Sequence, residues 1–77
     1  MLPQDYAKTV TIQGKTFQVR AMKSPGDYDG DPYAGCLRIE IEHDGKLVLH
    51  SDDPTVKWQD ATEENVDSLI RVNEPAI

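Results

Sequence analysis

The chain has 77 residues and a net charge of −6, and both values limit what it can be. A chain of this length forms a single domain with one thin core and has no room for a deep cleft. Its content of 38% hydrophobic and 29% charged residues is typical of a folded domain rather than a disordered one. We therefore expect one domain over residues 1–77 that is not an enzyme.

The charge is distributed unevenly along the chain. Residues 1–26 hold four basic side chains and one acidic one, whereas residues 27–67 hold twelve acidic side chains and three basic ones. Direct nucleic-acid binding requires a basic face, so we do not expect it. An acidic surface attracts basic partners and accelerates encounter with them, although the same charge also serves solubility.

No segment has the pattern of a targeting or membrane-spanning sequence. The first six residues lack the basic region and the apolar run of a signal peptide. No stretch approaches the roughly 20 apolar residues that cross a bilayer, so we expect a cytoplasmic protein without membrane contact. Cys36 is the single cysteine, which excludes an internal disulfide and favours a buried structural thiol.

The first predicted element is a β-hairpin formed by residues 9–13 and 16–21, whose polar and apolar side chains alternate. Gly14 and Lys15 between them are typical of a two-residue type II′ turn. If residues 9–13 lie outermost in the sheet, their uncharged edge would permit a homodimer. The predicted register brings four apolar side chains to one face in two pairs, Ile12 with Phe17 and Val10 with Val19.

Residues 23–35 follow without a helical or strand period, and a segment of this kind is usually functional or disordered. They contain three aspartates, two tyrosines, two prolines and three glycines. Tyrosine offers a large contact area at low entropic cost, and aspartate suits a partner that presents lysine or arginine. We interpret the segment as a recognition surface whose partner-binding residues are Asp27, Tyr28, Asp29, Asp31 and Tyr33.

The same segment also permits a cation-binding hypothesis. Asp27, Asp29 and Asp31 have the 1, 3, 5 spacing of a calcium loop. The EF-hand pattern next requires glycine at the sixth position and glutamate at the twelfth, where this chain has Pro32 and Arg38. A small-ligand or divalent-cation site in the Asp27–Asp31 segment is therefore an alternative, whereas the favoured interpretation involves no metal and no cofactor.

A second β-hairpin is predicted from the alternating residues 37–42 and 47–50. A two-residue turn at Asp44 and Gly45 would place a leucine beside a glutamate. A one-residue slip moves every side chain to the other face, so the hydrophobic pattern favours a three-residue loop over residues 43–45, with glycine as the bulge residue. This register gives two apolar pairs, Ile41 with Leu47 and Ile39 with Leu49.

The C-terminal element is predicted to be a helix that begins near Asp60 and ends at about Asn73. Asp60 and Glu63 have the spacing of a capping box, and Pro75 prevents the helix from continuing. Trp58 is expected to pack between helix and sheet. One apolar stripe recurs at i, i+3 and i+4, formed by Val66, Leu69 and Ile70.

Together these elements predict an α+β fold, ββ–loop–ββ–α, in which one C-terminal helix packs on one face of a small antiparallel sheet. The other face of the sheet should contact solvent. A small-ligand site on this open face, around Arg20, Arg38 and His50, is a further alternative. The residues assigned to the open face are Thr9, Thr11, Gln18, Arg20, Arg38, Glu40, Glu42, Val48 and His50.

A second acidic run follows the second hairpin, where Asp52-Asp53-Pro54 is typical of a turn and the remaining acids lie near the helix start. If this run and residues 27–31 lie on one side, their carboxylates could imitate the spacing of phosphates, so a DNA mimic is another alternative. This secondary acidic surface comprises Asp52, Asp53, Asp60, Glu63, Glu64 and Asp67.

Candidates for catalysis are few. His43 and His50 have no further ligand at metal spacing, and the chain contains no glycine-rich phosphate loop or serine elbow. The sequence therefore favours a non-enzymatic, acidic interaction module that binds and inhibits or modulates a larger partner protein with a basic surface. In size and charge alone it is similar to the small inhibitors that phages and mobile elements make against host proteins.

Overall fold

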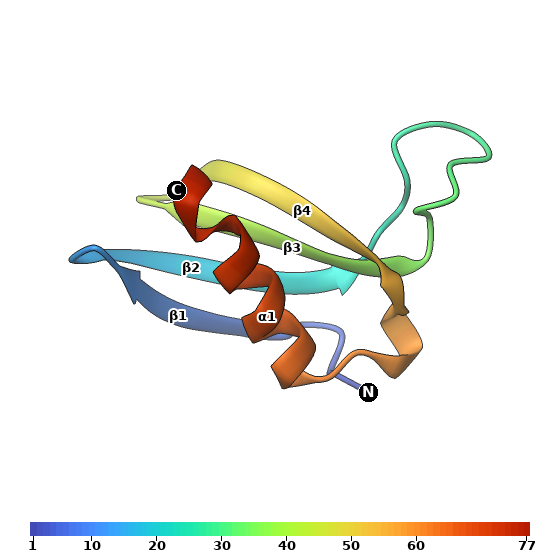
Figure 1. The fold of residues 1–77 in the computed structure, drawn as a ribbon, viewed down its shortest axis with the longest axis horizontal. Helices are drawn as coiled ribbons and strands as arrows, with labels where there is room; N and C mark the ends of the chain where they lie inside the picture. The colour runs from blue at the N-terminus through green and yellow to red at the C-terminus, as the bar shows by residue number, and fades with distance from the viewer.

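The chain folds into one four-stranded antiparallel sheet and one C-terminal helix in the computed structural model, which describes residues 1–77 (Figure 1). This confirms the predicted α+β class. None of the helices has the length and apolar character needed to cross a bilayer. The strands lie in the sheet in sequence order: β1 (Ala7–Ile12), β2 (Lys15–Lys23), β3 (Cys36–His43) and β4 (Lys46–Lys57). The 3₁₀ turn η1 (Trp58–Asp60) leads to helix α1 (Glu63–Asn73), which is followed by η2 (Glu74–Ala76).

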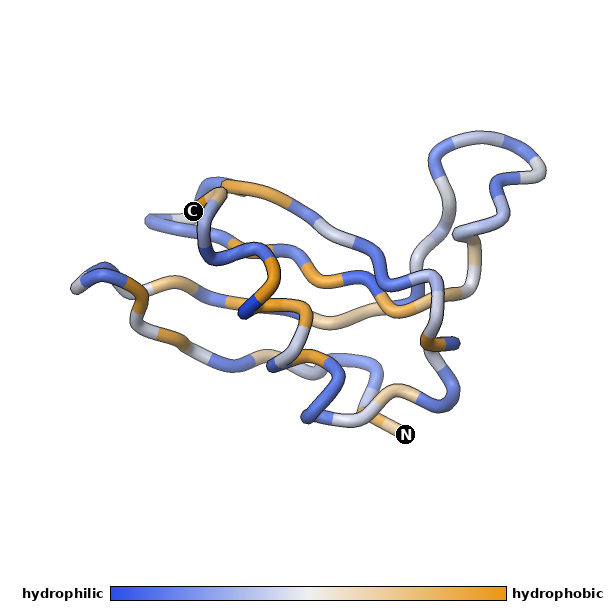
Figure 2. The backbone as a smooth tube through the Cα atoms, in the orientation of Figure 1, coloured by the Kyte–Doolittle hydropathy of each residue, from blue (hydrophilic) through white to orange (hydrophobic).

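Helix α1 lies over one face of the sheet, and apolar side chains from both elements form the core (Figure 1). Hydrophobic and hydrophilic positions alternate along β2 and β3, and hydrophobic positions recur at helical spacing along α1 (Figure 2). Each element therefore has one apolar side that faces the core. Trp58, expected near this junction, is 7% exposed and joins the same cluster. The stripe of Val66, Leu69 and Ile70 is buried, together with Phe17, Val19, Leu37, Ile39 and Ile41 of the sheet.

The first hairpin turns one residue earlier than predicted, at Gln13 and Gly14. Their φ angles of 51° and 78° are those of a type I′ turn, whose twist matches that of the flanking strands. The register differs from the prediction by two residues, which keeps each side chain on its predicted face because side-chain orientation repeats every two residues. The observed pairs are Val10 with Phe17 and Ile12 with Lys15, so the predicted pairs Ile12 with Phe17 and Val10 with Val19 are wrong.

The predicted three-residue loop of the second hairpin is also wrong. The turn has two residues, Asp44 and Gly45, with φ angles of 52° and 77°, and Leu47 lies opposite Glu42. The strand then bulges at Val48, which restores the apolar alternation by placing Leu49 opposite Ile41 and Ser51 opposite Ile39. The extra residue that the pattern required is in the strand rather than in the loop, and it leaves Leu47 55% exposed.

Helix α1 begins two residues later than the predicted capping box implies, because Asp60 lies in η1. The N-cap is Thr62, whose Oγ1 accepts from the backbone N–H of Asn65 (3.3 Å) and whose own N–H donates to Asn65 Oδ1 (2.9 Å). The predicted box of Asp60 and Glu63 is therefore wrong, and a Thr62–Asn65 box takes its place. The predicted end of the helix at Asn73 is confirmed.

Candidate functional site

The segment between β2 and β3, residues 24–35, extends beyond one end of the sheet, and we call it the β2–β3 loop (Figure 1). Backbone hydrogen bonds close it at its base. The N–H of Ser24 donates to the carbonyl of Cys36 (2.8 Å), and the N–H of Gly35 donates to the carbonyl of Ser24 (2.8 Å). The N–H of Cys36 also donates to the carbonyl of Tyr33 (3.2 Å). The loop therefore has a defined path although it contains no helix or strand.

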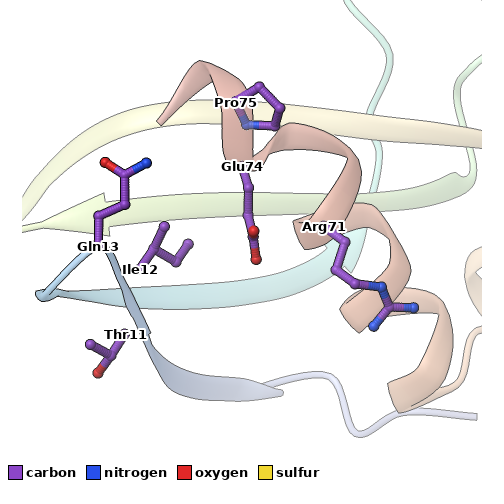
Figure 3. Close-up of a pocket in the computed structure, with 6 residues that line it drawn as sticks. All are labelled: Thr11, Ile12, Gln13, Arg71, Glu74 and Pro75. Atoms are coloured by element: carbon purple, nitrogen blue, oxygen red, sulfur yellow. The ribbon is translucent and has the colours of Figure 1, made fainter.

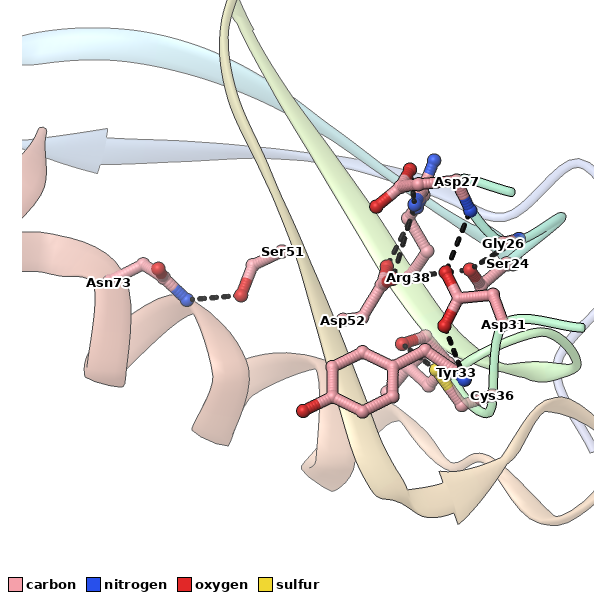
Figure 4. Close-up of polar contacts among 11 residues, drawn as sticks. Ser24, Gly26, Asp27, Asp31, Tyr33, Cys36, Arg38, Ser51, Asp52 and Asn73 are labelled. Atoms are coloured by element: carbon pink, nitrogen blue, oxygen red, sulfur yellow. Dashed lines mark hydrogen bonds and ion pairs between the residues drawn. The ribbon is translucent and has the colours of Figure 1, made fainter. Parts of the chain in front are cut away.

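A buried ion pair lies beneath this loop. Arg38 of β3 opposes Asp52 of β4, and Arg38 Nε and Nη2 donate to Asp52 Oδ1 (2.7 Å) and Oδ2 (3.1 Å) (Figure 4). The two side chains are only 10% and 9% exposed. Arg38 was expected to contact solvent on the open face opposite His50. It lies on that face, because it alternates with the core residues Leu37 and Ile39, but its expected solvent contact and its pairing with His50 are wrong. The bulge in β4 changes the register so that His50 opposes Glu40, and the loop covers the guanidinium.

The first half of the loop is attached to this pair through two side chains. Arg38 Nη2 also donates to Asp27 Oδ1 (3.2 Å). Ser24, which is 1% exposed, donates from Oγ to Asp52 Oδ2 (3.2 Å) and accepts from the N–H of Gly26 (3.2 Å). Sequence reasoning missed Ser24 and the role of Arg38, because Arg38 alternates with apolar residues as the exposed Glu40 and Glu42 were expected to do, and nothing in that pattern marks it as buried.

Charge and hydrogen bonding keep both members of the pair ionised. The hydrogen bond from Arg38 lowers the pKa of Asp52 below its ordinary value, and this outweighs the opposing effect of burial. The same bond raises the pKa of Arg38. A carboxylate with a lowered pKa is poorly suited to proton transfer near neutral pH, so the geometry assigns the pair a structural role.

Asp31 folds the outer half of the loop onto itself. Its Oδ2 accepts from the N–H of Asp27 (2.8 Å) and its Oδ1 accepts from the N–H of Tyr33 (2.9 Å) (Figure 4). Gly26 has a φ of 76°, and a Cβ built there would lie 3.0 Å from the Cβ of Asp31. Only glycine fits this turn without displacement.

The five predicted partner-binding residues thus divide into two groups. Asp27 and Asp31 make hydrogen bonds that hold the loop together, although the side chain of Asp27 is itself 66% exposed, whereas Tyr28, Asp29 and Tyr33 are exposed without such contacts from their side chains. The tyrosines are 66% and 45% exposed, and Asp29 makes no side-chain hydrogen bond or ion pair. The three aspartates do not converge as calcium ligands would, since no group of three or more ligand side chains comes together anywhere in the chain.

The secondary acidic surface is only partly available. Asp52 is buried, and the segment Asp52-Asp53-Pro54 belongs to β4 rather than to the predicted turn. Asp53 Oδ1 accepts from the N–H (2.9 Å) and the hydroxyl (2.6 Å) of Thr55. Lys8 of β1 lies 2.7 Å from Asp67 and 3.7 Å from Glu63. Two residues of this surface are exposed and without an ion-pair partner, Asp60 and Glu64.

The remaining surface offers little chemistry. Arg20 on the open face pairs with Glu42 and lies 3.9 Å from Glu40. Burial raises the pKa of the Cys36 thiol, which therefore stays protonated.

A hollow of about 420 Å³ lies between the first hairpin turn and the end of α1, and no histidine or cysteine lines it (Figure 3). Its lining residues are Thr11, Ile12, Gln13, Arg71, Glu74 and Pro75.

Comparisons of the chain with protein-family models, curated proteins and solved structures find no match.

Proposed function

We propose that this protein is a non-enzymatic interaction module that binds a larger protein through three exposed side chains of the β2–β3 loop, Tyr28, Asp29 and Tyr33, and thereby inhibits or modulates it. One observation carries the proposal. Tyr28 and Tyr33 remain 66% and 45% exposed on a loop that the polar contacts of Ser24, Asp27 and Asp31 hold in place. Large aromatic side chains cluster at the centres of protein interfaces, where they supply much of the binding energy.

The anchoring contacts favour binding because they reduce its entropic cost. Ordering a mobile side chain at an interface costs about 0.5–1.5 kcal/mol, and ordering loop backbone adds to this. Here Asp31 fixes the outer half of the loop and Ser24 fixes its base. The tyrosines are therefore presented on a backbone that needs little further ordering.

Charge indicates the kind of partner. Asp29 lies between the two tyrosines in the chain and has no internal partner, and the whole protein carries a net charge of −6. A basic surface on the partner would be attracted at long range and would meet a free carboxylate on the loop. Salt should therefore slow association more than it accelerates dissociation.

The two alternative functions have less support. Cation binding at Asp27 and Asp31 would require both carboxylates to give up their present contacts with Arg38 and the loop backbone. A DNA mimic requires an array of free carboxylates, yet Asp52 is buried and Asp67 is paired with Lys8.

The test compares two triple variants in binding experiments. The loop variant is Tyr28→Ala/Asp29→Asn/Tyr33→Ala, which spares the anchoring aspartates. The control variant removes the same charge and two exposed apolar side chains from the opposite end of the sheet, and it is Asp44→Asn/Leu47→Ala/Val48→Ala. Both are immobilised beside the unmodified protein and exposed to lysate of the source cells at physiological salt. Retained proteins are identified by mass spectrometry, purified and assayed for activity.

A single protein should bind the unmodified chain and the control variant but not the loop variant, and the unmodified chain should alter its activity. Equal retention of many basic proteins by all three would contradict the proposal. So would a partner lost only from the control variant.

A further inference from the structure

A second hollow lies at the base of the β2–β3 loop; neither exposed tyrosine lines it, although Pro32 and Ala34 on either side of Tyr33 do. It has a volume of about 340 Å³ and is open to solvent. Lys23, the last residue of β2, and Lys57, the last residue of β4, line it from two strands. Gly35 and Cys36 lie between them at the start of β3.

The charge of this hollow is opposite to that of the protein. Its two charged lining residues are both lysines, and no carboxylate lines it. Neither lysine forms an ion pair, unlike Lys8, Arg20 and Arg38, which are paired with acidic side chains. The hollow therefore brings together two lysines without ion-pair partners, although Asp52 and Asp53 are close enough to raise the pKa of the Cys36 thiol in its lining.

The two lysines flank the start of β3 from its two neighbouring strands. Lys23 opposes Leu37 and Lys57 opposes Cys36, at a backbone separation of two strand spacings, or roughly 10 Å. Because Leu37 and Cys36 are consecutive, the two lysine side chains leave the sheet on opposite faces and come together only at its end, where both line the hollow. Their flexible four-carbon stems can bring both ammonium groups onto one ligand. Gly35 has a φ of 90°, and the single neighbour of a Cβ built there would be Lys23 Cε at 3.9 Å. The missing side chain leaves the space beside Lys23 open.

We propose that this hollow binds a doubly charged oxyanion, namely a phosphate group. Two ammonium ions match the charge of a phosphate monoester, and lysine binds phosphate as a compact point charge. Gln59, which also lines the hollow, adds an amide donor. The volume is at the lower end of the range for small-ligand pockets, so it admits the phosphate and a small part of its carrier.

The site does not depend on the proposed function of Tyr28, Asp29 and Tyr33, because none of these three residues lines it. The same phosphate chemistry has two sources, free inorganic phosphate and a phosphorylated side chain of another protein. Both present the same dianion to the lysines, so they are separated by experiment.

The test is a titration with inorganic phosphate at constant ionic strength, followed by amide chemical shifts. Three proteins are compared: the unmodified chain, Lys23→Gln/Lys57→Gln, and the control Lys15→Gln/Lys46→Gln, which loses the same charge from exposed turn-flanking positions. The amides of Gly35 and Cys36 should shift saturably in the unmodified chain and in the control. Affinity should fall at least about tenfold in the Lys23/Lys57 variant, a loss of about 1.4 kcal/mol.

Shifts that do not saturate, or that weaken equally in both double variants, would overturn the proposal and indicate a general charge effect. The thermal midpoint of each variant is measured beside the titration to establish that each is folded. A second titration uses a phosphoserine peptide and its unphosphorylated form. Tighter binding of the phosphopeptide than of phosphate assigns the site to a phosphorylated protein, whereas equal affinities assign it to the free ion.

Discussion

Arg38 and Asp52 carry full charges although their side chains are only 10% and 9% exposed. Removing two ions from water costs several kcal/mol for each ion, and their attraction offsets this only when the geometry is good and the remaining polar atoms are satisfied. Here the contact is bidentate, and Ser24 and Asp27 occupy further hydrogen-bonding positions. No buried polar side-chain atom in the chain lacks a partner. The pair is thus tolerated, and its main consequence is to fix the loop.

Removing one member of the pair should be costly. Asp52→Asn leaves the guanidinium of Arg38 buried without a counter-charge, and we expect a loss of about 3 kcal/mol in the free energy of unfolding. Asp29→Asn removes the same charge from an exposed side chain without contacts and should change stability by less than about 0.5 kcal/mol. Urea unfolding at neutral pH measures both. Equal effects of the two substitutions would contradict the structural role of the pair.

The same carboxylate makes stability depend on pH. The pKa of Asp52 is lowered in the folded protein relative to its ordinary value of 3.8, so in acid the unfolded chain takes up the proton first. The stabilisation is therefore complete well above pH 3.8 and is lost as the pH falls through the pKa of the folded state. Unfolding curves are measured at a series of pH values for the unmodified chain and for Asp52→Asn. The difference between their free energies of unfolding should be constant near neutral pH and should become smaller in acid. A difference that grows in acid would contradict this sign.

At the scale of elements, the β2–β3 loop shows how a segment without secondary structure is held in one path. Its polar side chains satisfy backbone donors that would otherwise face water, as Asp31 does for two N–H groups. Its glycines supply positive φ angles where the path turns. Gly26 and Gly30 both have such angles, 76° and 82°, but only Gly26 approaches other atoms closely.

This difference permits a matched test. Gly30→Ala should cost about 1 kcal/mol, because alanine is disfavoured at positive φ. Gly26→Ala carries the same backbone cost and also places a methyl group 3.0 Å from the Cβ of Asp31. We expect it to lose at least about 1 kcal/mol more. Hydrogen exchange of the Gly35 amide, which donates to Ser24, reports loop opening locally. Equal exchange rates of this amide in the two variants would show that the close approach of a Cβ at position 26 to the Cβ of Asp31 does not constrain the loop.

At the scale of the whole molecule, one small apolar cluster supports both the sheet and the helix. A domain of this size has a free energy of unfolding of roughly 4–12 kcal/mol. Leu37, Ile39 and Ile41 are fully buried in β3, between β2 and β4 and beneath α1. A single deletion in this strand therefore removes a large share of the total stability.

Ile39→Ala should lower the free energy of unfolding by about 3 kcal/mol, because it creates a cavity at the centre of the core. Val72→Ala truncates an apolar side chain that is 75% exposed on α1, and it should have little effect. Calorimetry or urea unfolding followed by near-UV and far-UV signals measures both variants. Loss of the Trp58 signal before the loss of secondary structure would contradict a single cooperative core.

Local patterns in the sequence decided which residues face the core. The alternation in β2 and β3 and the i, i+3, i+4 stripe of α1 depend on the backbone period of each element, so they can be read without knowing any partner. For the same reason the first hairpin kept its buried face although its predicted turn was wrong. The exposure of Tyr28 and Tyr33 also followed from a segment with no apolar period.

The sequence by itself therefore determined the class of fold, the buried faces of β2, β3 and α1 and the place of the loop, but not the face of Leu47 in β4. Tertiary structure alone decided the bulge at Val48, the burial of Arg38 and the division of the loop aspartates into anchors and free groups. The reason is distance along the chain. Arg38 is 14 residues from Asp52 and 11 from Asp27, so no local period relates them. Their contacts exist only once β3 and β4 have paired in one register.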